Sequence, residues 1–426
     1  MTQPRGYALR AVGLFCLGWA LVYANRSTLF PMLKPIGEEF GLSGVQTGAV
    51  ASAYFFTYVA LQIPLGQLID RLGVKRVLVT TYALAGLAVL SVGLFARSYP
   101  LLMALVALHG AGAAAYYAAA YSASFAAVPE KYRGLSAAVI NSGMAIGLVL
   151  GLSAAGPIFH RAGTWRAPFL FLALPTLLVA LAFRLFVHDV RPVRPPRVPV
   201  LDLLRDRQLL AVNLSGFCSL YGFWVVMTWG PAYFQTERGL PLEAAGYLTA
   251  VVAAASIPGA LIFASLSDRL GRRRLSVLMM PLAAVAVGSM VVAPGTGWLA
   301  AALVAYGALG KLAWDPIGAS WIGDHVGRTR PEAMGAALGL FTVFAMGSSV
   351  VAPLVSGWLR DLTGSLAWAF VLGATVVLAG AAFAAVAGET RAEPGAERSI
   401  AQAQQEGYVA TTGRSARRLR RALRRP

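Results

Sequence analysis

Three charged residues, Arg26, Lys311 and Asp315, stand inside long apolar segments of the sequence. If those segments cross a membrane, each charge costs from about 2.5 to more than 10 kcal/mol unless it faces water or a partner. An arginine presents a planar fork of donors that matches the two oxygens of a carboxylate. Lys311 and Asp315 are four residues apart, so they share one face of a helix and can pair. If all three side chains face one cavity, two cations outweigh one carboxylate, which favours an anionic ligand.

Each of these charges also has a purely structural interpretation. Arg26 can extend its head group to the membrane surface, and Lys311 with Asp315 can form a permanent pair that only joins helices. Buried ion pairs stabilise proteins poorly compared with apolar residues, which favours a functional pair. In that interpretation Lys311 is a second substrate cation, and Asp315 is its switchable partner and the ion-coupling candidate. Pro316 follows the pair and favours a kink there.

The composition indicates the class of protein that must position these charges. The chain has 426 residues, of which 58% are hydrophobic and 13% are charged, whereas a soluble chain has about 25% charged residues. This excludes a soluble enzyme, a disordered protein and a disulfide-stapled secreted domain. Cys16 and Cys218 lie in apolar runs without metal or redox spacing, so we expect them to pack. The spans contain no metal-ligand cluster, nucleotide-binding loop or nucleophile–base pair, so we expect no enzyme, no metal and no cofactor.

Apolar runs of about 20 residues, separated by polar breaks, predict an all-α membrane protein with twelve transmembrane helices. We expect no cleavable signal peptide before the first one. The expected spans are 9–33, 44–69, 75–96, 99–127, 134–159, 165–187, 208–236, 241–266, 275–294, 297–323, 332–358 and 365–387.

The basic residues predict the orientation of these spans. With the N-terminus inside, the inside loops and both ends hold 28 of the 36 Lys and Arg residues, the outside loops hold six, and two lie within spans. That bias obeys the positive-inside rule. We therefore expect a multi-pass protein of the cell inner membrane with both termini cytoplasmic. Most of the formal net charge of +18 then serves orientation, and we expect no nucleic-acid partner.

The spans divide into two sets of six. We expect an N-terminal half over 1–187, a proline-rich cytoplasmic linker over 188–207, and a C-terminal half over 208–387. The linker prolines forbid a continuous helix. The basic segment 388–426 is expected to be a disordered cytoplasmic tail.

An internal repeat supports two pseudo-symmetric six-helix halves. The loop after span two matches the loop after span eight at an offset of 198 residues. The glycine-rich spans five and eleven also correspond, and we expect both to let helices approach closely. The loop candidates for gating are Gly66, Asp70, Arg71 and Gly73 in the first copy and Asp268, Arg269 and Gly271 in the second; the glycines of the spans are Gly143, Gly147 and Gly151 against Gly335, Gly339 and Gly347.

Each part of this loop has a physical role. Gly73 and Gly271 permit a turn with positive φ at the end of a helix. Asp70 and Asp268 can accept hydrogen bonds across the halves, and so latch the inner side when the cavity opens outward. The alternative is that both loops are only solvated determinants of topology, which two equivalent copies make improbable.

The loop pattern GlyXLeuXAspArgXGlyXLys/Arg resembles the major facilitator superfamily, and the resemblance extends over residues 7–390. Within that superfamily the chain is most similar to the anion:cation symporter branch. The residues that match this branch are Tyr23 to Arg26, Tyr58 to Gly66, Trp165 to Phe169, Trp229 to Phe234, and Gly364.

The resemblance implies a transporter of carboxylates, acid sugars or other organic anions, with protons or sodium as the coupling ion. It places Tyr23, Tyr58 and Tyr117 near the middle of helices that line the cavity in relatives. With Asn25 and Trp224 they are our candidate substrate ligands beside Arg26 and Lys311. Membrane aromatics more often pack or line the interface, which is the alternative for each ring.

The sequence also departs from the branch. Many relatives have an acidic residue just before the arginine of span one, where this chain has Asn25. The arginine and glutamate that relatives carry in span four are absent from the stretch around His109. Either Asp315 has taken over coupling, or transport is uncoupled or an exchange. His109 can titrate near neutral pH, or it is simply packed.

We therefore expect a secondary active transporter of a small organic anion that works by alternating access, in proton-coupled uptake. Its expected partners are the anion, a proton or other coupling ion and the lipid bilayer, and we expect a monomer. The alternatives are an exporter of drugs or neutral solutes in the same superfamily, and a membrane receptor that does not transport.

Overall fold

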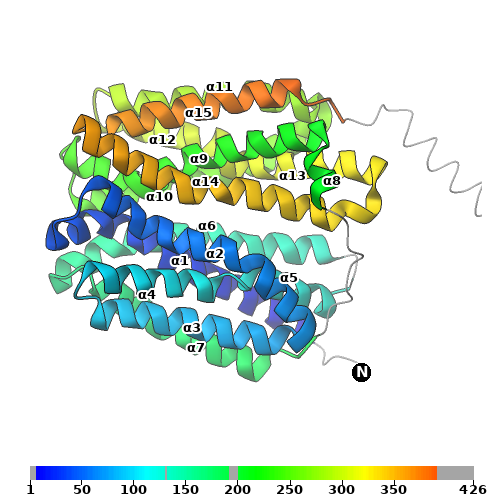
Figure 1. Ribbon diagram of the computed structural model, residues 1–426, viewed down its shortest axis with the longest axis horizontal. Helices are drawn as coiled ribbons and strands as arrows, with labels where there is room; N and C mark the ends of the chain where they lie inside the picture. Colours follow the sequence, from blue (N-terminus) through cyan, green and yellow to red (C-terminus); the bar gives the residue numbers. More distant parts are fainter. Residues whose placement is uncertain (1–5, 130–131, 191–199, 391–426) are drawn as a thin grey trace, which may run out of the picture.

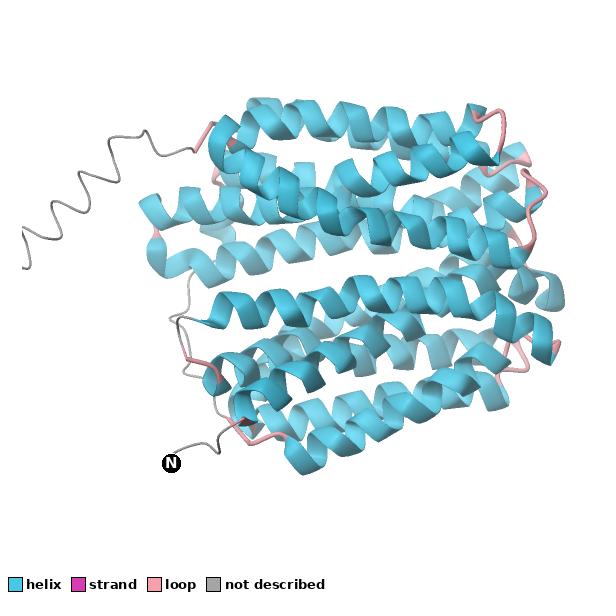
Figure 2. Ribbon diagram, turned by 180° about the vertical axis from the view of Figure 1, so that it is seen from behind, coloured by secondary structure: helices cyan, strands magenta, loops and turns pink. Residues whose placement is uncertain are grey.

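The computed structural model describes residues 6–129, 132–190 and 200–390. Within these residues the regular structure is helical and contains no strand (Figure 2). The predicted linker and tail fall largely on 191–199 and 391–426, which lie outside the described residues. The described part of the linker includes the short helix α8 (Val200–Leu204).

Twelve spans among the described residues are long and apolar enough to cross a membrane, as predicted. Ten are single helices: α1 (Tyr7–Phe40), α2 (Gly44–Leu72), α3 (Val74–Phe95), α6 (Arg133–Ala162), α7 (Ala167–Phe186), α9 (Arg207–Thr236), α10 (Leu242–Leu270), α11 (Arg272–Val292), α14 (Met334–Thr363) and α15 (Ala367–Val386). Two consist of two pieces each: α4 (Tyr99–Ala113) with α5 (Tyr116–Ala127), and α12 (Thr296–Leu309) with α13 (Lys311–Thr329).

The helices form two bundles that lie side by side (Figure 1). The N-terminal half contains α1 to α7 and the C-terminal half contains α9 to α15. We call the right-hand end in Figure 1, where the described chain begins and ends, the linker end, and the opposite end the far end. This arrangement confirms the prediction of an all-α protein with two six-helix halves.

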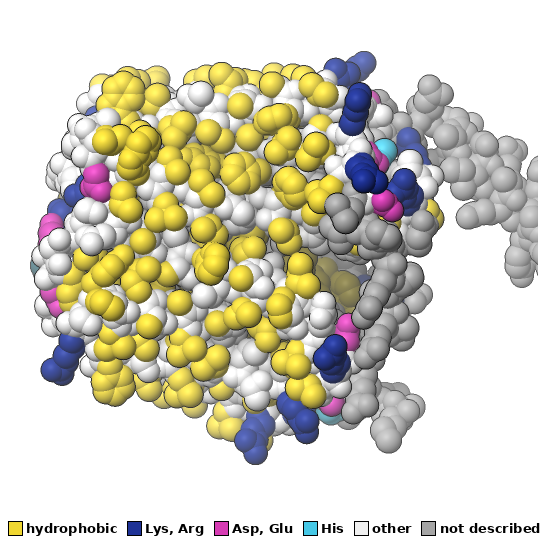
Figure 3. Space-filling model, in the orientation of Figure 1, with side chains coloured by type: hydrophobic (Ala, Val, Ile, Leu, Met, Phe, Trp, Pro, Cys, Tyr) yellow, Lys and Arg dark blue, Asp and Glu magenta, His cyan; other side chains and the backbone are white. Residues whose placement is uncertain are grey.

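The outer surface has the apolar belt that a bilayer requires. Yellow side chains cover the middle of the molecule, while charged side chains gather at its two ends (Figure 3). Lipid tails cannot hydrogen-bond, and an α-helix suits this position because its backbone groups bond to one another while its outer face is apolar.

The repeated loops form equivalent turns at the linker end. Gly73 and Gly271 have φ values of +89° and +99°, which only glycine adopts readily, as the sequence predicted. A carboxylate seals each turn: Asp189 Oδ1 accepts from Lys75 N at 3.1 Å, and Glu389 Oε1 accepts from Arg272 N at 2.9 Å. Each carboxylate thereby satisfies free amides at the start of α3 or α11.

Hydrogen bonds between α2 and α14 join the two halves at the far end. Asp361 accepts from Gly44 N at 2.5 Å and from Val45 N at 2.8 Å, so a residue of one half caps a helix of the other. Farther along the same pair, Ser52 Oγ donates to Val350 O at 2.7 Å. The far end is therefore closed in this conformation.

The glycine-rich runs of α6 and α14 do not play the same role. A Cβ on Gly143 or Gly147 would lie 2.3 or 2.1 Å from a carbonyl oxygen of α1, so these glycines let α6 press against α1. Nothing lies within 4 Å of a Cβ on Gly335 or Gly339. The expectation of close packing is therefore correct for α6 and wrong for these positions of α14. The repeat preserves the glycines but not their neighbours.

Candidate functional site

Arg26, on α1, lies where the two halves meet. Its side chain is only 2% exposed. Its Cζ lies 3.9 Å from the centre of the Tyr23 ring, 5.4 Å from that of Phe55 and 5.0 Å from that of Trp224. Trp224 belongs to α9 of the opposite half. The positive charge therefore lies against aromatic faces from both halves, which attract a cation.

The guanidinium is enclosed but not satisfied. Its Nε and Nη2 atoms are buried and have no hydrogen-bond partner among the residues that the structure describes. The aromatic faces reduce the cost of the charge but leave Nε and Nη2 without an acceptor among the described residues. An unmade hydrogen bond of a buried group costs about 1–3 kcal/mol, and more when the group is charged. Since a guanidinium only donates, an acceptor with two oxygens is the group that completes this site.

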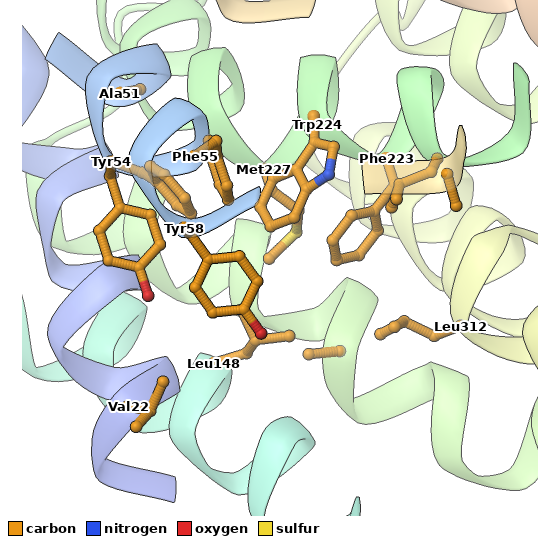
Figure 4. Packing of buried hydrophobic residues seen from close by; sticks show 14 of the residues in the cluster. Val22, Ala51, Tyr54, Phe55, Tyr58, Leu148, Phe223, Trp224, Met227 and Leu312 are labelled. Atoms are coloured by element: carbon orange, nitrogen blue, oxygen red, sulfur yellow. The ribbon is translucent and has the colours of Figure 1, made fainter. Parts of the chain in front are cut away.

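Tyrosines of α2 extend the aromatic group. Tyr54 and Tyr58 lie beside Phe55 on α2, in the same region as Trp224 of α9 (Figure 4). The rings of Tyr54 and Tyr58 stack at 5.9 Å, and the hydroxyl of Tyr54 is buried without a partner. His109 of α4 packs edge-on against Tyr54 with 4.8 Å between ring centres. Tyr58, a predicted ligand, is thus brought to the site of Arg26.

The second pair of charges lies in the C-terminal half, at the start of α13. Lys311 Nζ lies 2.9 Å from Asp315 Oδ2, which agrees with the predicted pairing of these residues. The Asp315 side chain is 38% exposed, whereas that of Lys311 is largely buried. The pair is therefore accessible to a ligand or a proton from the Asp315 side.

A helix break lies directly before this pair, at a residue that the sequence analysis did not single out. Pro316 lies inside α13, and the interruption falls at Gly310, whose φ of −81° and ψ of −158° are extended. A helix is easily interrupted at Gly310, because glycine loses more conformational freedom in a helix than any other residue. α4 and α5 are likewise separated, at Ala114 and Ala115. Discontinuous spans at corresponding places in two halves are typical of transporter binding sites.

Tyr117 connects the two groups of residues. It is the second residue of α5, its side chain is 46% exposed, and its ring lies 4.6 Å from that of Tyr121 and 6.1 Å from that of Trp19. It also lies within electrostatic range of Asp315, in the other half. Tyr117 thus stands between the aromatic group around Arg26 and the charged pair of α13.

Two expectations about this site need correction. Asn25 turns away from Arg26: its Nδ2 donates to Thr176 Oγ1 of α7 at 2.8 Å, so it joins two helices of one half. Arg26 was expected in a water-accessible vestibule shared with Lys311, but in this conformation aromatic rings cover it. Asn25 is therefore not retained as a direct ligand, and access to Arg26 requires these rings to move.

The predicted gating residues lie at the linker end. Asp268 pairs with Arg272 at 2.5 Å, and Arg272 Nε lies 3.3 Å from Asp324, all within the C-terminal half. Arg71 and Arg269 are exposed, Asp70 is half-buried, and a Cβ on Gly66 would meet nothing within 4 Å. The second loop is thus engaged with its own half in the conformation whose far end is closed.

Sequence reasoning did not single out Phe55 or Asp361. Phe55 is one of several apolar residues in span two, and only its packing against Trp224, at 4.3 Å between ring centres, marks it. Asp361 could have been found from its position, because it is an acidic residue at the end of an apolar span, directly after Arg360.

The chain was compared with known families and proteins. A family model described as Major Facilitator Superfamily matches residues 15–338. The probable sulfoacetate transporter SauU of Cupriavidus necator is 28% identical over 310 residues, which cover 67% of this chain and 71% of that protein. The probable galactarate/D-glucarate transporter GudP of Bacillus subtilis is 25% identical over 402 residues, 84% of this chain and 87% of that protein.

More distant proteins have the same architecture. A voltage-gated purine nucleotide uniporter of Rattus norvegicus is 24% identical over 389 residues, which cover 85% of this chain and 86% of the relative. A solved bacterial homolog of the human lysosomal transporter Spinster, in an inward-facing and occupied conformation, superposes with a TM-score of 0.72. It is 17% identical and the match covers 90% of this chain and 96% of that one, so it shows the fold alone.

The family model, the twelve helices and the relatives, all transporters by name, agree with the predicted family and with the prediction that the chain is not an enzyme. The chain belongs to the Major Facilitator Superfamily and is a multi-pass membrane transporter.

Proposed function

We propose that this transporter moves a small organic anion across the inner membrane by alternating access, in proton-coupled uptake with both termini in the cytoplasm. The observation that supports the anion is Arg26, a buried cation between the halves with two donor atoms that no acceptor in the described part of the chain satisfies. A carboxylate or sulfonate oxygen supplies both the missing acceptor and the missing negative charge. Tyr23, Tyr58 and Trp224 form the walls of this site.

Lys311 and Asp315 form the second half of the site. Lys311 binds either Asp315, as at 2.9 Å here, or a second acidic group of the cargo. When the cargo takes Lys311, Asp315 loses its cation and becomes free to bind the coupling proton. Binding of the anion and of a proton thereby become linked, and Tyr117 lies between the two cations as a hydroxyl ligand.

The names of the relatives agree with this arrangement. Sulfoacetate bears a sulfonate and a carboxylate, and galactarate bears two carboxylates, and these are the compounds for which the two bacterial relatives are named. A short dianion matches one cation from each half. Such a ligand contacts both halves, so its binding can favour their closure around it.

The contacts between the halves support a mechanism of alternating access. The far end is held by Asp361 and by Ser52, while Asp268 of the repeated loop bonds within its own half. We propose that the opposite state breaks the far-end bonds and lets Asp70 and Asp268 latch the linker end. Rocking of two rigid halves about the central site is the general mode for such folds.

Uptake into proteoliposomes tests the role of Arg26. With sulfoacetate and galactarate as probes, Arg26→Gln should lower uptake about a hundredfold or more, because two charge-assisted hydrogen bonds are lost. Arg26→Lys keeps the charge without the fork and should retain more activity. Arg97→Gln, at an exposed far-end arginine, is the matched control. Full uptake of these anions by Arg26→Gln would show that Arg26 is not the anion ligand, and no uptake of either anion by the wild type would favour a transporter of neutral or cationic compounds.

Asp315→Asn tests the coupling. The variant should lose accumulation driven by a pH gradient but keep exchange of labelled for unlabelled anion, because Asn binds no proton in this range. Asp202→Asn, at an exposed residue of the linker region, is the control. Accumulation that persists in Asp315→Asn would show that the proton binds elsewhere. Binding of the anion without any flux in the wild type would instead indicate a receptor.

A further inference from the structure

A basic groove lies at the linker end of α3 and α7, away from the central site. It has a volume of about 400 Å³ and is open on one side. Two of its three cations come from the first turn of α3 and the third from the last turn of α7. In Figure 3 dark blue side chains gather over these helix ends, at the lower right. The residues that line the groove are Lys75, Arg76, Val79, Thr80, Arg184 and Asp189.

The positive charge of this groove is not neutralised by the described part of the protein. Lys75, Arg76 and Arg184 have no carboxylate within 4.0 Å among the described residues. Asp189 is the single acidic residue of the groove, and it accepts from the backbone amide of Lys75 against the turn at Gly73. Its charge is thus directed to the N-terminus of α3, and three cations remain free to bind an anion.

The groove continues into an apolar surface on the membrane side. Leu84 and Leu87 of α3 and Leu181 and Leu185 of α7 are exposed large apolar residues on the two helices that border it. A free anion would gain nothing from this surface. A molecule with an anionic head and hydrocarbon tails fits both parts at once.

The repeat provides an internal comparison. Arg273 of the second loop corresponds to Lys75 at the same offset of 198, and its Nη2 donates to Ala385 O of α15 at 2.6 Å. Arg272 is paired with Asp268 and Asp324. The second copy thus engages Arg272 and Arg273 in bonds within its own half, whereas the described residues offer the side chains of Lys75 and Arg76 no such partner.

We propose that the groove between α3 and α7 binds one phospholipid with an anionic head group. Its phosphate contacts Lys75, Arg76 and Arg184, and its acyl chains follow the exposed leucines of the two helices. The chemistry that recognises it is a phosphodiester with net negative charge, held at the leaflet that faces the linker end. This binding is separate from the proposed transport site and does not rest on it.

Native mass spectrometry of the detergent-purified full chain tests the proposal, with phosphatidylglycerol and phosphatidylethanolamine as probes. The wild type should bind one phosphatidylglycerol more tightly than phosphatidylethanolamine. The triple variant Lys75→Gln, Arg76→Gln, Arg184→Gln should lose about a hundredfold of that affinity, since each basic side chain near an anionic surface contributes somewhat less than tenfold. Inorganic phosphate, which shares the charge but lacks the tails, should not displace the lipid at similar concentration.

The matched control is Arg273→Gln with Arg274→Gln, which removes the corresponding charges of the other half and should leave the lipid bound. Unchanged melting temperatures of the variants in detergent establish that they are folded. Equal binding of the two lipids by the wild type would overturn the proposal, as would full phosphatidylglycerol affinity in the triple variant. Displacement by inorganic phosphate would also overturn it, and would assign the groove to a free anion.

Discussion

Arg26 lies among four aromatic rings, three from its own half and one from the other, at 3.9 to 5.8 Å from its Cζ. Each such ring contributes about 0.5–2 kcal/mol to a cation. Nε and Nη2 nevertheless have no acceptor among the described residues, so the cost of burying these two atoms is not offset by hydrogen bonds. This is the physical reason for proposing an anion, and it depends on one side chain rather than on the net charge of the chain.

A different acidic residue, Asp206, predicts a pH dependence of stability outside the spans. Burial alone would raise the pKa of Asp206, but His325 Nε2 at 2.8 Å and the amides of Gln208 and Leu209 lower it below its ordinary value. A carboxyl whose pKa is lowered by folding stabilises the protein above its unfolded pKa of about 3.9. That contribution disappears as the pH falls through the lower, folded pKa.

The measurement is the melting temperature in detergent of the wild type and of Asp206→Asn. Above about pH 5 the variant should be less stable by about 1 kcal/mol, the usual value of a helix N-cap. The difference should shrink as the pH approaches 3. A gap that stays constant down to acid pH would mean that the ionised carboxylate of Asp206 contributes nothing beyond its shape.

The residues near Arg26 show what spacing can and cannot predict. Tyr23 is three residues away, so helical periodicity places both on one face, and the pairing of Lys311 with Asp315 follows from the same rule. Asn25 is adjacent to Arg26, and one residue turns a helix by about 100°, which explains why Asn25 points at α7 instead. Phe55 and Trp224 arrive from other helices, so no local pattern could bring them to Arg26.

At the scale of the helices, the turns and the capping carboxylates at the helix ends determine where each helix starts and stops. Both turns were predictable because the same spacing of Asp, Arg and Gly occurs twice in the chain, and a glycine at the end of a helix indicates a turn with positive φ, as found at Gly73 and Gly271. Their carboxylate caps, Asp189 and Glu389, were not predicted, since each lies more than 100 residues from the helix that it caps. The sequence favoured a kink at Pro316, and the interruption of the helix lies six residues earlier, at the extended backbone of Gly310.

The cap across the halves gives a prediction about helix α2. Asp361→Ala removes both acceptors of the Gly44 and Val45 amides, at a cost of about 1 kcal/mol for a lost cap. The far end should therefore open about five times more often. Hydrogen exchange of the amides in 44–52 and 350–357, followed by mass spectrometry, should rise by that factor.

Asp202→Ala is the control for this variant, because Asp202 is an exposed residue of the linker region and is not part of either proposed latch. It should leave exchange at 44–52 unchanged. If Asp361→Ala exchanges as slowly as the wild type, the latch is held by apolar packing of α2 on α14 and not by the carboxylate.

At the scale of the whole molecule, the twelve spans and the two halves followed from composition, apolar run length and the repeat. Those signals are strong because the hydrocarbon core of a bilayer offers no hydrogen-bond partners, so a spanning segment must satisfy its backbone groups within the protein. The relation between the halves is a matter of tertiary contacts: the closed far end, the rings over Arg26 and the position of Tyr117 depend on it. An anion that binds residues of both halves links this arrangement to transport.

Isothermal titration of the purified transporter with sulfoacetate and with galactarate is the most direct test of the anion site. The wild type and Arg97→Gln should bind at least one of the two with equal affinity, and Arg26→Gln should bind it about a hundredfold more weakly. Undiminished binding of these dianions by Arg26→Gln would contradict the assignment of Arg26 as the anion ligand.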